Sequence, residues 1–150
     1  MRSRFLRRVT ASMAAVVAVP AALTGCFAAP PLDSSYEEKI PAALESADLG
    51  LSDVWASRST DGFAVLLNVG GTSARDDVSP DDLRAMLQII RANNTLGGDK
   101  LDFSLRNADD SAFVDLDRPA QSLGAPGRVS ASDGPLGIVL DWDKVNSIIG

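Results

Sequence analysis

The spacing of the apolar residues changes twice in the middle of the chain, and this change limits the folds that the chain can adopt. Residues 63–69 carry apolar side chains on both faces of an alternating pattern, which predicts a strand in the centre of a sheet. Residues 80–93 place their apolar side chains every three or four positions, which is typical of a helix with one buried stripe. Residues 101–106 return to strict alternation, so the chain is predicted to combine helices with a sheet. The helical stripe consists of Leu83, Met86, Leu87 and Ile90.

The helix over residues 80–93 has clear signals at its start and its end. Ser79 can cap its first turn, and Pro80 has the fixed φ that suits the first helical position. Asp81 and Asp82 follow, where the positive end of the helix dipole stabilises carboxylates. The helix is expected to end at about Asn93.

Other segments predict further helices and strands on both sides of this helix. A strand pair over 54–58 and 63–69 surrounds a turn at 59–62, where Asp-Gly suits positive φ, and Gly70-Gly71 is expected to end the second strand. The remaining expected elements are a helix over 36–47 that Pro41 starts or kinks, strands over 112–117 and 137–142, one helical turn at 119–123, and a last short helix capped by Asp143.

This order of elements favours one α+β domain over residues 36–150. We expect two layers, with an antiparallel sheet of about four to five strands and the helices packed on one face. A parallel sheet is less favoured, because too few strand pairs are separated by crossover helices. About 115 residues can form one ordinary domain that buries roughly 65% of its surface.

Residues 1–25 resemble an export signal in the order of their parts. Residues 1–8 contain four arginines and no acidic residue, and residues 9–23 are mostly apolar or small. A charged region followed by an apolar region and small residues is typical of a secretory signal. A membrane span would need about 20 unbroken apolar residues, whereas this run is shorter and contains Pro20.

The sequence Leu23-Thr24-Gly25-Cys26 resembles the lipobox of bacterial lipoproteins. The resemblance implies signal cleavage between Gly25 and Cys26, diacylglycerol on the Cys26 sulfur, and a fatty acid such as palmitate on the freed amine. It implies attachment to the cell membrane at the extracytoplasmic face. A buried core cysteine is the alternative, but it fits poorly beside a proline-rich stretch.

Residues 26–35 are expected to be the lipidated N-terminus and a flexible tether. The sequence FAAPPLDSS after Cys26 has two prolines and small or polar residues, which favour extended chain. Nine residues reach at most about 30 Å. The domain over 36–150 would therefore stay near the membrane that holds its lipid.

The charge of the processed chain argues against nucleic acid as a partner. The chain has 14 basic and 20 acidic residues, and loss of residues 1–25 removes four arginines and no acid. Ten basic residues then remain against 20 acidic ones, for a net charge of −10. Nucleic-acid binding needs clustered lysine and arginine. Anionic lipid would also repel this domain, so the lipid on Cys26 must provide the membrane contact.

The sequence predicts no catalytic residue, no metal site and no cofactor. It contains no histidine, and its one cysteine is assigned to the lipid, which leaves no histidine-based triad and no ordinary zinc ligand set. Aspartates are abundant, and most are expected on solvated faces, with calcium binding or paired acid-base chemistry left open. Trp55 is expected in the core, with an outward position as the alternative. The aspartate pairs are Asp76/Asp77, Asp81/Asp82, Asp109/Asp110, Asp115/Asp117 and Asp141/Asp143.

These observations predict a lipid-anchored, extracytoplasmic binding or accessory protein of unknown ligand. One face of its sheet, or the loops at one end, would hold a partner in the cell envelope. An aspartate-dependent hydrolase of the envelope is the alternative enzyme, although no enzymatic activity is expected. A structural subunit beside an integral membrane protein is the third hypothesis.

Overall fold

The computed structural model describes residues 33–125, 128–129 and 137–150 of the chain. The predicted signal over 1–25, the cleavage position at Gly25 and Cys26, and the tether up to residue 32 lie outside the described residues. Lipidation and cleavage therefore remain predictions. Within the described ranges, no helix has the length and apolar character needed to cross a membrane.

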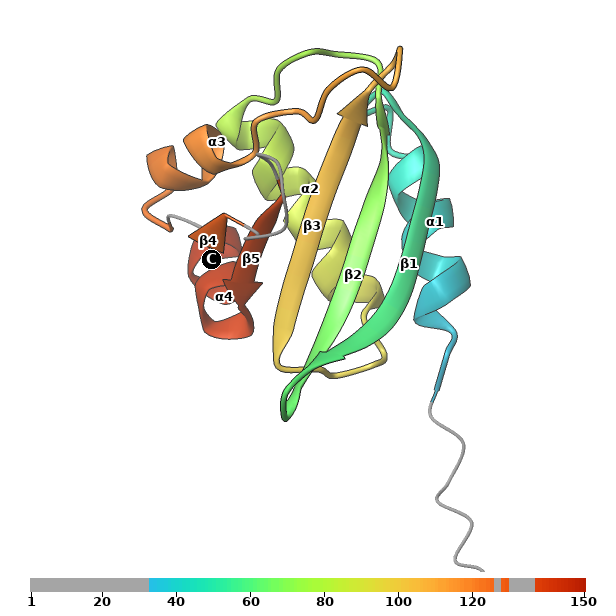
Figure 1. The fold of residues 1–150 in the computed structure, drawn as a ribbon, viewed down its shortest axis with the longest axis vertical. Helices are drawn as coiled ribbons and strands as arrows, with labels where there is room; N and C mark the ends of the chain where they lie inside the picture. The colour runs from blue at the N-terminus through green and yellow to red at the C-terminus, as the bar shows by residue number, and fades with distance from the viewer. Residues whose placement is uncertain (1–32, 126–127, 130–136) are drawn as a thin grey trace, which may run out of the picture. The chain divides into compact units, whose positions relative to one another are not determined.

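The domain is built on a five-stranded sheet with the order β1-β2-β3-β5-β4 (Figure 1). Strand β1 pairs antiparallel with β2, β2 pairs parallel with β3, and β5 pairs antiparallel with both β3 and β4. The strands are β1 (Leu51–Asp61), β2 (Ala64–Ser73), β3 (Lys100–Asn107), β4 (Arg128–Val129) and β5 (Ile138–Asp141).

Helices α1 and α2 lie behind the sheet in Figure 1, and α3 and α4 pack against α2. The helices are α1 (Tyr36–Glu45), α2 (Pro80–Asn93), α3 (Asp117–Ser122) and α4 (Trp142–Ile149). The predicted α+β class is confirmed. Strand β2 is central in the sheet, as its two apolar faces predict.

The sheet is mixed, so the expectation of a purely antiparallel sheet is wrong for one strand pair. Helix α2 has 14 residues and is about 21 Å long. This length returns the chain from the end of β2 towards the end where β2 begins. Strand β3 therefore runs parallel to β2, which is the usual result when a helix connects two neighbouring strands.

The core lies between one face of the sheet and the helices. Alternate residues of β2 and β3 point to this face, and the stripe of α2 packs onto them. Removing such side chains from water is the main force that holds the fold together. The fully buried large side chains include Ile40, Leu44, Leu67, Leu83, Leu87, Ile90, Leu101, Phe103, Leu105 and Ile138.

Both expected ends of α2 are confirmed. Pro80 is the first residue of the helix, and the Ser79 hydroxyl accepts a hydrogen bond from the Asp82 N–H at 3.0 Å. Helix α1 also forms, but it begins at Tyr36 and runs through Pro41. The expected helix start at Tyr36 is confirmed, and of the two roles expected for Pro41 the start of the helix is wrong, since the preceding turn is already helical.

Three element boundaries differ from the prediction. Strand β1 continues to Asp61, so the hairpin turn is the pair Gly62-Phe63, with Gly62 at φ +60° as a two-residue turn requires. Strand β2 passes through Gly70-Gly71 and ends at Ser73, because both glycines pair with a neighbouring strand. Helix α4 starts at Trp142 directly after Asp141, so Asp143 lies inside it and does not cap it.

Residues 112–117 do not form the expected strand. Only one isolated bridge, between Phe113 and Arg106, connects this segment to β3. Val114 and Leu116 are nevertheless buried. The alternating pattern therefore reflects the alternating burial of side chains in an irregular segment. This segment leads into α3, which lies close to the helical turn expected at 119–123.

Replacing Ser79 by alanine should lower the free energy of unfolding by about 1 kcal/mol, because the Asp82 N–H loses its capping acceptor. Urea denaturation measures this change. Ser46→Ala is the matched control, since that exposed hydroxyl bonds only to the Ala43 carbonyl of its own helix. An equal loss of stability in the two variants would contradict the capping role of Ser79.

Candidate functional site

The face of the sheet opposite the helices is largely polar. Leu67 and Val69 of β2 point to the helices, so the residues between and beyond them point to the other side. We call this side the outer face. Its residues on the two central strands are Leu66, Asn68, Gly70 and Thr72 of β2, with Lys100, Asp102, Ser104 and Arg106 beside them on β3.

A groove of about 300 Å³ lies on the outer face where β2 and β3 end. We call it the outer-face groove. It brings together side chains from β1, β2, β3 and the irregular segment after β3. Its lining residues are Asp53, Trp55, Gly70, Gly71, Thr72, Ser104, Arg106 and Phe113.

A β-bulge positions Trp55 at one side of the groove. The register of β1 against β2 shifts between Ser52 and Trp55, and Asp53 has φ +49°. That left-handed conformation costs a residue other than glycine about 1–3 kcal/mol, and bulges commonly re-aim a side chain at a binding site. The side chain of Trp55 is 48% exposed, so the expected core position is wrong and the outward alternative is correct.

Gly70 makes room for the Trp55 ring. The two residues are partners across β1 and β2. A Cβ atom on Gly70 would lie less than 3.0 Å from three atoms of the indole. The ring therefore lies directly against the backbone of β2, and its other side is available at the groove.

Phe113 forms the opposite aromatic side of the groove. The Arg106 guanidinium lies 4.4 Å from the centroid of the Phe113 ring, close enough for a cation–π contact. Nη1 of Arg106 also lies 3.0 Å from Oδ1 of Asp110, as an ion pair. These contacts join the segment after β3 to the strand itself.

The turn before Phe113 is stabilised by its own polar side chains. Asn107 Oδ1 accepts a hydrogen bond from the Ala112 N–H at 3.0 Å. Asp109 Oδ1 accepts one from the Ser111 N–H at 3.0 Å. The hydroxyl and the N–H of Ser111 together lower the pKa of Asp109, because both favour the ionised carboxylate. The turn therefore places Phe113 together with its bridge to Arg106 of β3.

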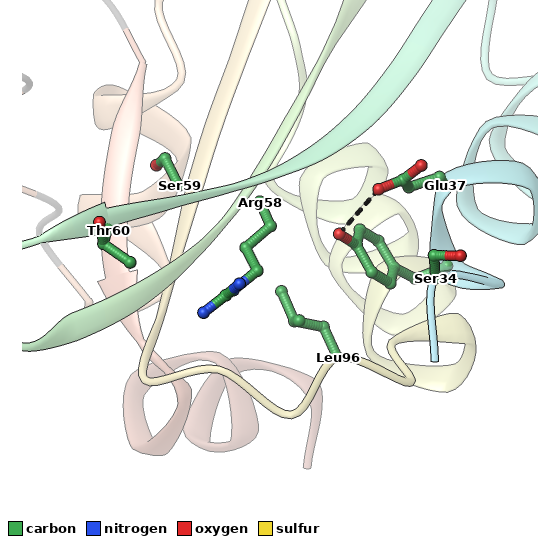
Figure 2. A pocket seen from close by; sticks show the side chains of 7 residues that line it. Ser34, Glu37, Arg58, Ser59, Thr60 and Leu96 are labelled. Carbon is green, nitrogen blue, oxygen red and sulfur yellow. Dashed lines mark hydrogen bonds between the residues drawn. The ribbon is translucent and has the colours of Figure 1, made fainter. Parts of the chain in front are cut away.

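A second hollow of about 410 Å³ lies where α1 begins (Figure 2). We call it the α1 pocket. Tyr36 is buried there, and its hydroxyl donates to Glu37 Oε1 at 3.0 Å. Burial of the hydroxyl is the main cause that raises the pKa of Tyr36, and the hydrogen bond to Glu37 is the second. The lining residues are Ser34, Tyr36, Glu37, Arg58, Ser59, Thr60 and Leu96.

Arg58 extends from β1 into the α1 pocket beside Leu96, while Glu37 lies on the α1 side (Figure 2). Opposite charges thus line one shallow hollow. The α1 pocket adjoins residues 58–60 of β1, and the outer-face groove adjoins residues 53–55 near the start of the same strand. The two hollows therefore lie at opposite ends of β1.

Four aspartates, from three of the pairs named from the sequence, form surface ion pairs. Asp81 pairs with Arg84 at 2.9 Å, Asp82 with Arg75 at 3.0 Å, Asp110 with Arg106 at 3.0 Å, and Asp115 with Arg118 at 3.8 Å. Such exposed pairs each contribute about 0–1 kcal/mol.

The other aspartates are spread over several places. Asp76 and Asp77 line a hollow of about 100 Å³ together with Asp115, and Asp141 and Asp143 lie at the start of α4. Across the residues that the structure describes, no three Asp, Glu, Cys or His side chains are grouped closely enough to hold a metal ion.

Asp102 differs from these surface aspartates in its surroundings. It lies partly buried on the outer face, beside Gly137. This burial raises its pKa above the usual 3.8, because the charged form loses hydration. Ser104, two residues further along β3, lies in the outer-face groove, so Asp102 borders the groove without lining it.

Comparison of the chain with models of protein families, with curated proteins and with solved structures gives no match. The candidate site therefore rests on its geometry. Sequence reasoning missed the groove as a site. The available signal was the Gly70-Gly71 pair inside a strand, since glycine in a strand often marks a close approach of another group.

Replacing Gly70 by alanine should lower the free energy of unfolding by about 1–3 kcal/mol, because the new methyl group overlaps the indole of Trp55. The same substitution in a Trp55→Ala background should cost much less. Urea denaturation of the four proteins in this cycle measures the coupling. Additive effects of the two substitutions would show that the ring does not rest on Gly70.

Asp102→Asn should raise the free energy of unfolding at pH 7. The pKa of Asp102 in the folded protein lies above 3.8, so ionising this carboxyl costs more in the folded state than in the unfolded state. The wild type is therefore not destabilised by Asp102 below pH 3.8, and it loses stability as the pH rises through the folded pKa. Asparagine, which stays neutral, avoids the loss, so the gain should vanish in acid. Thermal unfolding between pH 3 and 8 tests this, with Asp61→Asn at an exposed position as the control. A gain that persists at pH 3 would contradict the burial argument.

Proposed function

We propose that this protein is a lipid-anchored, extracytoplasmic binding protein and that the outer-face groove holds its ligand. The observation that carries the proposal is the convergence of Trp55, Arg106 and Phe113 on one groove from three separate segments. Two features of the groove reduce stability by themselves, namely the left-handed Asp53 and the half-exposed Trp55. Such features are typical of functional sites.

The outer-face groove lies away from the end of the domain where α1 begins. Helix α1 begins at the hairpin end of β1 and β2 (Figure 1). The residues that line the groove lie towards the other end of these strands. Residues 65–67 of β2 pair with the β1 residues of the α1 pocket, and residues 70–72 line the groove. The two places are therefore about 10–23 Å apart along the strand.

The anchor itself is proposed from the lipobox. Cys26 precedes Asp33 by seven residues, so its lipid would lie within about 25 Å of the point where the described domain begins. The acidic domain would be repelled by anionic headgroups, so the lipid would provide the contact with the membrane.

Mass spectrometry of the protein from cells of its own source should find a mature N-terminus at Cys26 that carries diacylglycerol. Cys26→Ser should abolish the lipid and leave the signal attached. Ser12→Ala, which changes the signal outside the lipobox, is the matched control and should keep both modifications. A mature chain without lipid, or one that starts elsewhere, would refute the anchor.

The full chain in detergent should co-sediment with insoluble cell-envelope material through the groove. Trp55→Ala and Phe113→Ala should each weaken this binding at least tenfold, because each removes one aromatic side of the groove. Phe63→Ala is the matched control, since Phe63 is a fully exposed aromatic residue outside the groove. Equal losses in all three variants would exclude the groove as the site.

A further inference from the structure

We infer that the ligand of the outer-face groove is a neutral carbohydrate, bound with the face of a sugar ring against Trp55. This inference rests on the proposed function, in which the groove is the ligand site. It adds the chemical class of the ligand.

The Trp55 ring offers a flat surface that fits a sugar ring. One side of the indole rests on Gly70, and the side chain remains half exposed. The face of an aromatic ring is electrically negative. The C–H hydrogens on one face of a pyranose ring are slightly positive, so they are attracted to this surface. An aliphatic side chain in this place would give the ligand no such attraction.

The polar groups of the groove suit hydroxyl groups at the edge of a sugar ring. Thr72 and Ser104 each offer a hydroxyl that can donate and accept. Asp53 offers acceptors and Arg106 offers donors. A sugar hydroxyl also donates and accepts, so each of these four side chains can find a partner on a carbohydrate.

The charge of the groove argues against an anionic ligand. Arg106 is the positive side chain in the lining, and Asp110 at 3.0 Å already compensates it. Asp53 adds a negative charge to the lining. A phosphate or nucleic-acid backbone would need uncompensated arginine or lysine here.

A proline-rich peptide is the main competitor, because such peptides also bind in aromatic grooves. Proline has no N–H group, so a proline-rich segment presents mainly carbonyl oxygens. The carboxylate of Asp53 would then lose water without gaining a donor, at a cost of about 1–3 kcal/mol or more. A carbohydrate can supply that donor, so it fits the groove better.

The test is titration of the ¹⁵N-labelled full chain, kept in a detergent without a sugar headgroup, followed by NMR. The chain has two tryptophans, and their indole N–H signals report two separate places. Trp142 lies in α4 under Arg91, outside the groove lining, and serves as the internal reference. The probes are cellopentaose, maltopentaose and chitotetraose, with a proline-rich decapeptide as the competing class.

At least one oligosaccharide should shift the Trp55 signal in a saturable way and leave the Trp142 signal unchanged. Phe113→Ala should raise the Kd at least tenfold, Phe63→Ala should not change it, and Trp55→Ala should abolish retention on the immobilised oligosaccharide. Thermal unfolding of each variant checks that it is folded. Thr72→Val, which keeps the shape but removes a hydroxyl, should raise the Kd severalfold if that group meets a sugar.

The outcomes separate the ligand class from the function of the groove. A saturable shift of Trp55 by the peptide alone would overturn the carbohydrate inference and retain the groove as a binding site. If no oligosaccharide shifts the Trp55 signal but Trp55→Ala weakens envelope binding at least tenfold, the carbohydrate inference is likewise overturned and the groove is retained as the binding site. No shift with any probe, together with unchanged envelope binding by Trp55→Ala, would overturn both proposals.

Discussion

The packing of α2 against the β2–β3 pair is the interaction on which the rest of the domain depends. It buries Leu87 and Ile90 against strands that contribute Leu67 and Phe103. It also makes β2 and β3 parallel, because the helix is the connection between them. The core between the sheet and the helices stabilises the domain, whereas the polar outer face contributes little apolar burial. The outer face is therefore free to carry a strained bulge and a half-exposed tryptophan.

The sequence predicted the parts of the fold that depend on local signals. Helix α2 carries its cap, its proline and its stripe within 15 consecutive residues, and the structure confirms both of its ends. The parallel pair could not be predicted in this way, because strand direction depends on where a helix docks. Residues 112–117 show a second limit, since Val114 and Leu116 alternate in burial without forming a strand.

The candidate site was less accessible to sequence reasoning than the fold. Trp55, Gly70 and Phe113 are far apart in the chain and meet only through the register of β1 on β2 and the bridge from Phe113 to Arg106. The bulge at Asp53 sets that register, and no local pattern marks it. The expectation that one face of the sheet, or the loops at one end, holds a partner stays a prediction.

The contact of the Trp55 ring with Gly70 also affects the entropy change when a ligand binds. A long side chain that moves freely before binding usually costs about 0.5–1.5 kcal/mol to immobilise. The backbone of β2 already restricts the rotation of the Trp55 ring in the free protein. A ligand that stacks on the ring would find it ordered in advance. Less of the interaction energy would then be spent on ordering the ring, so the groove would bind its ligand more tightly.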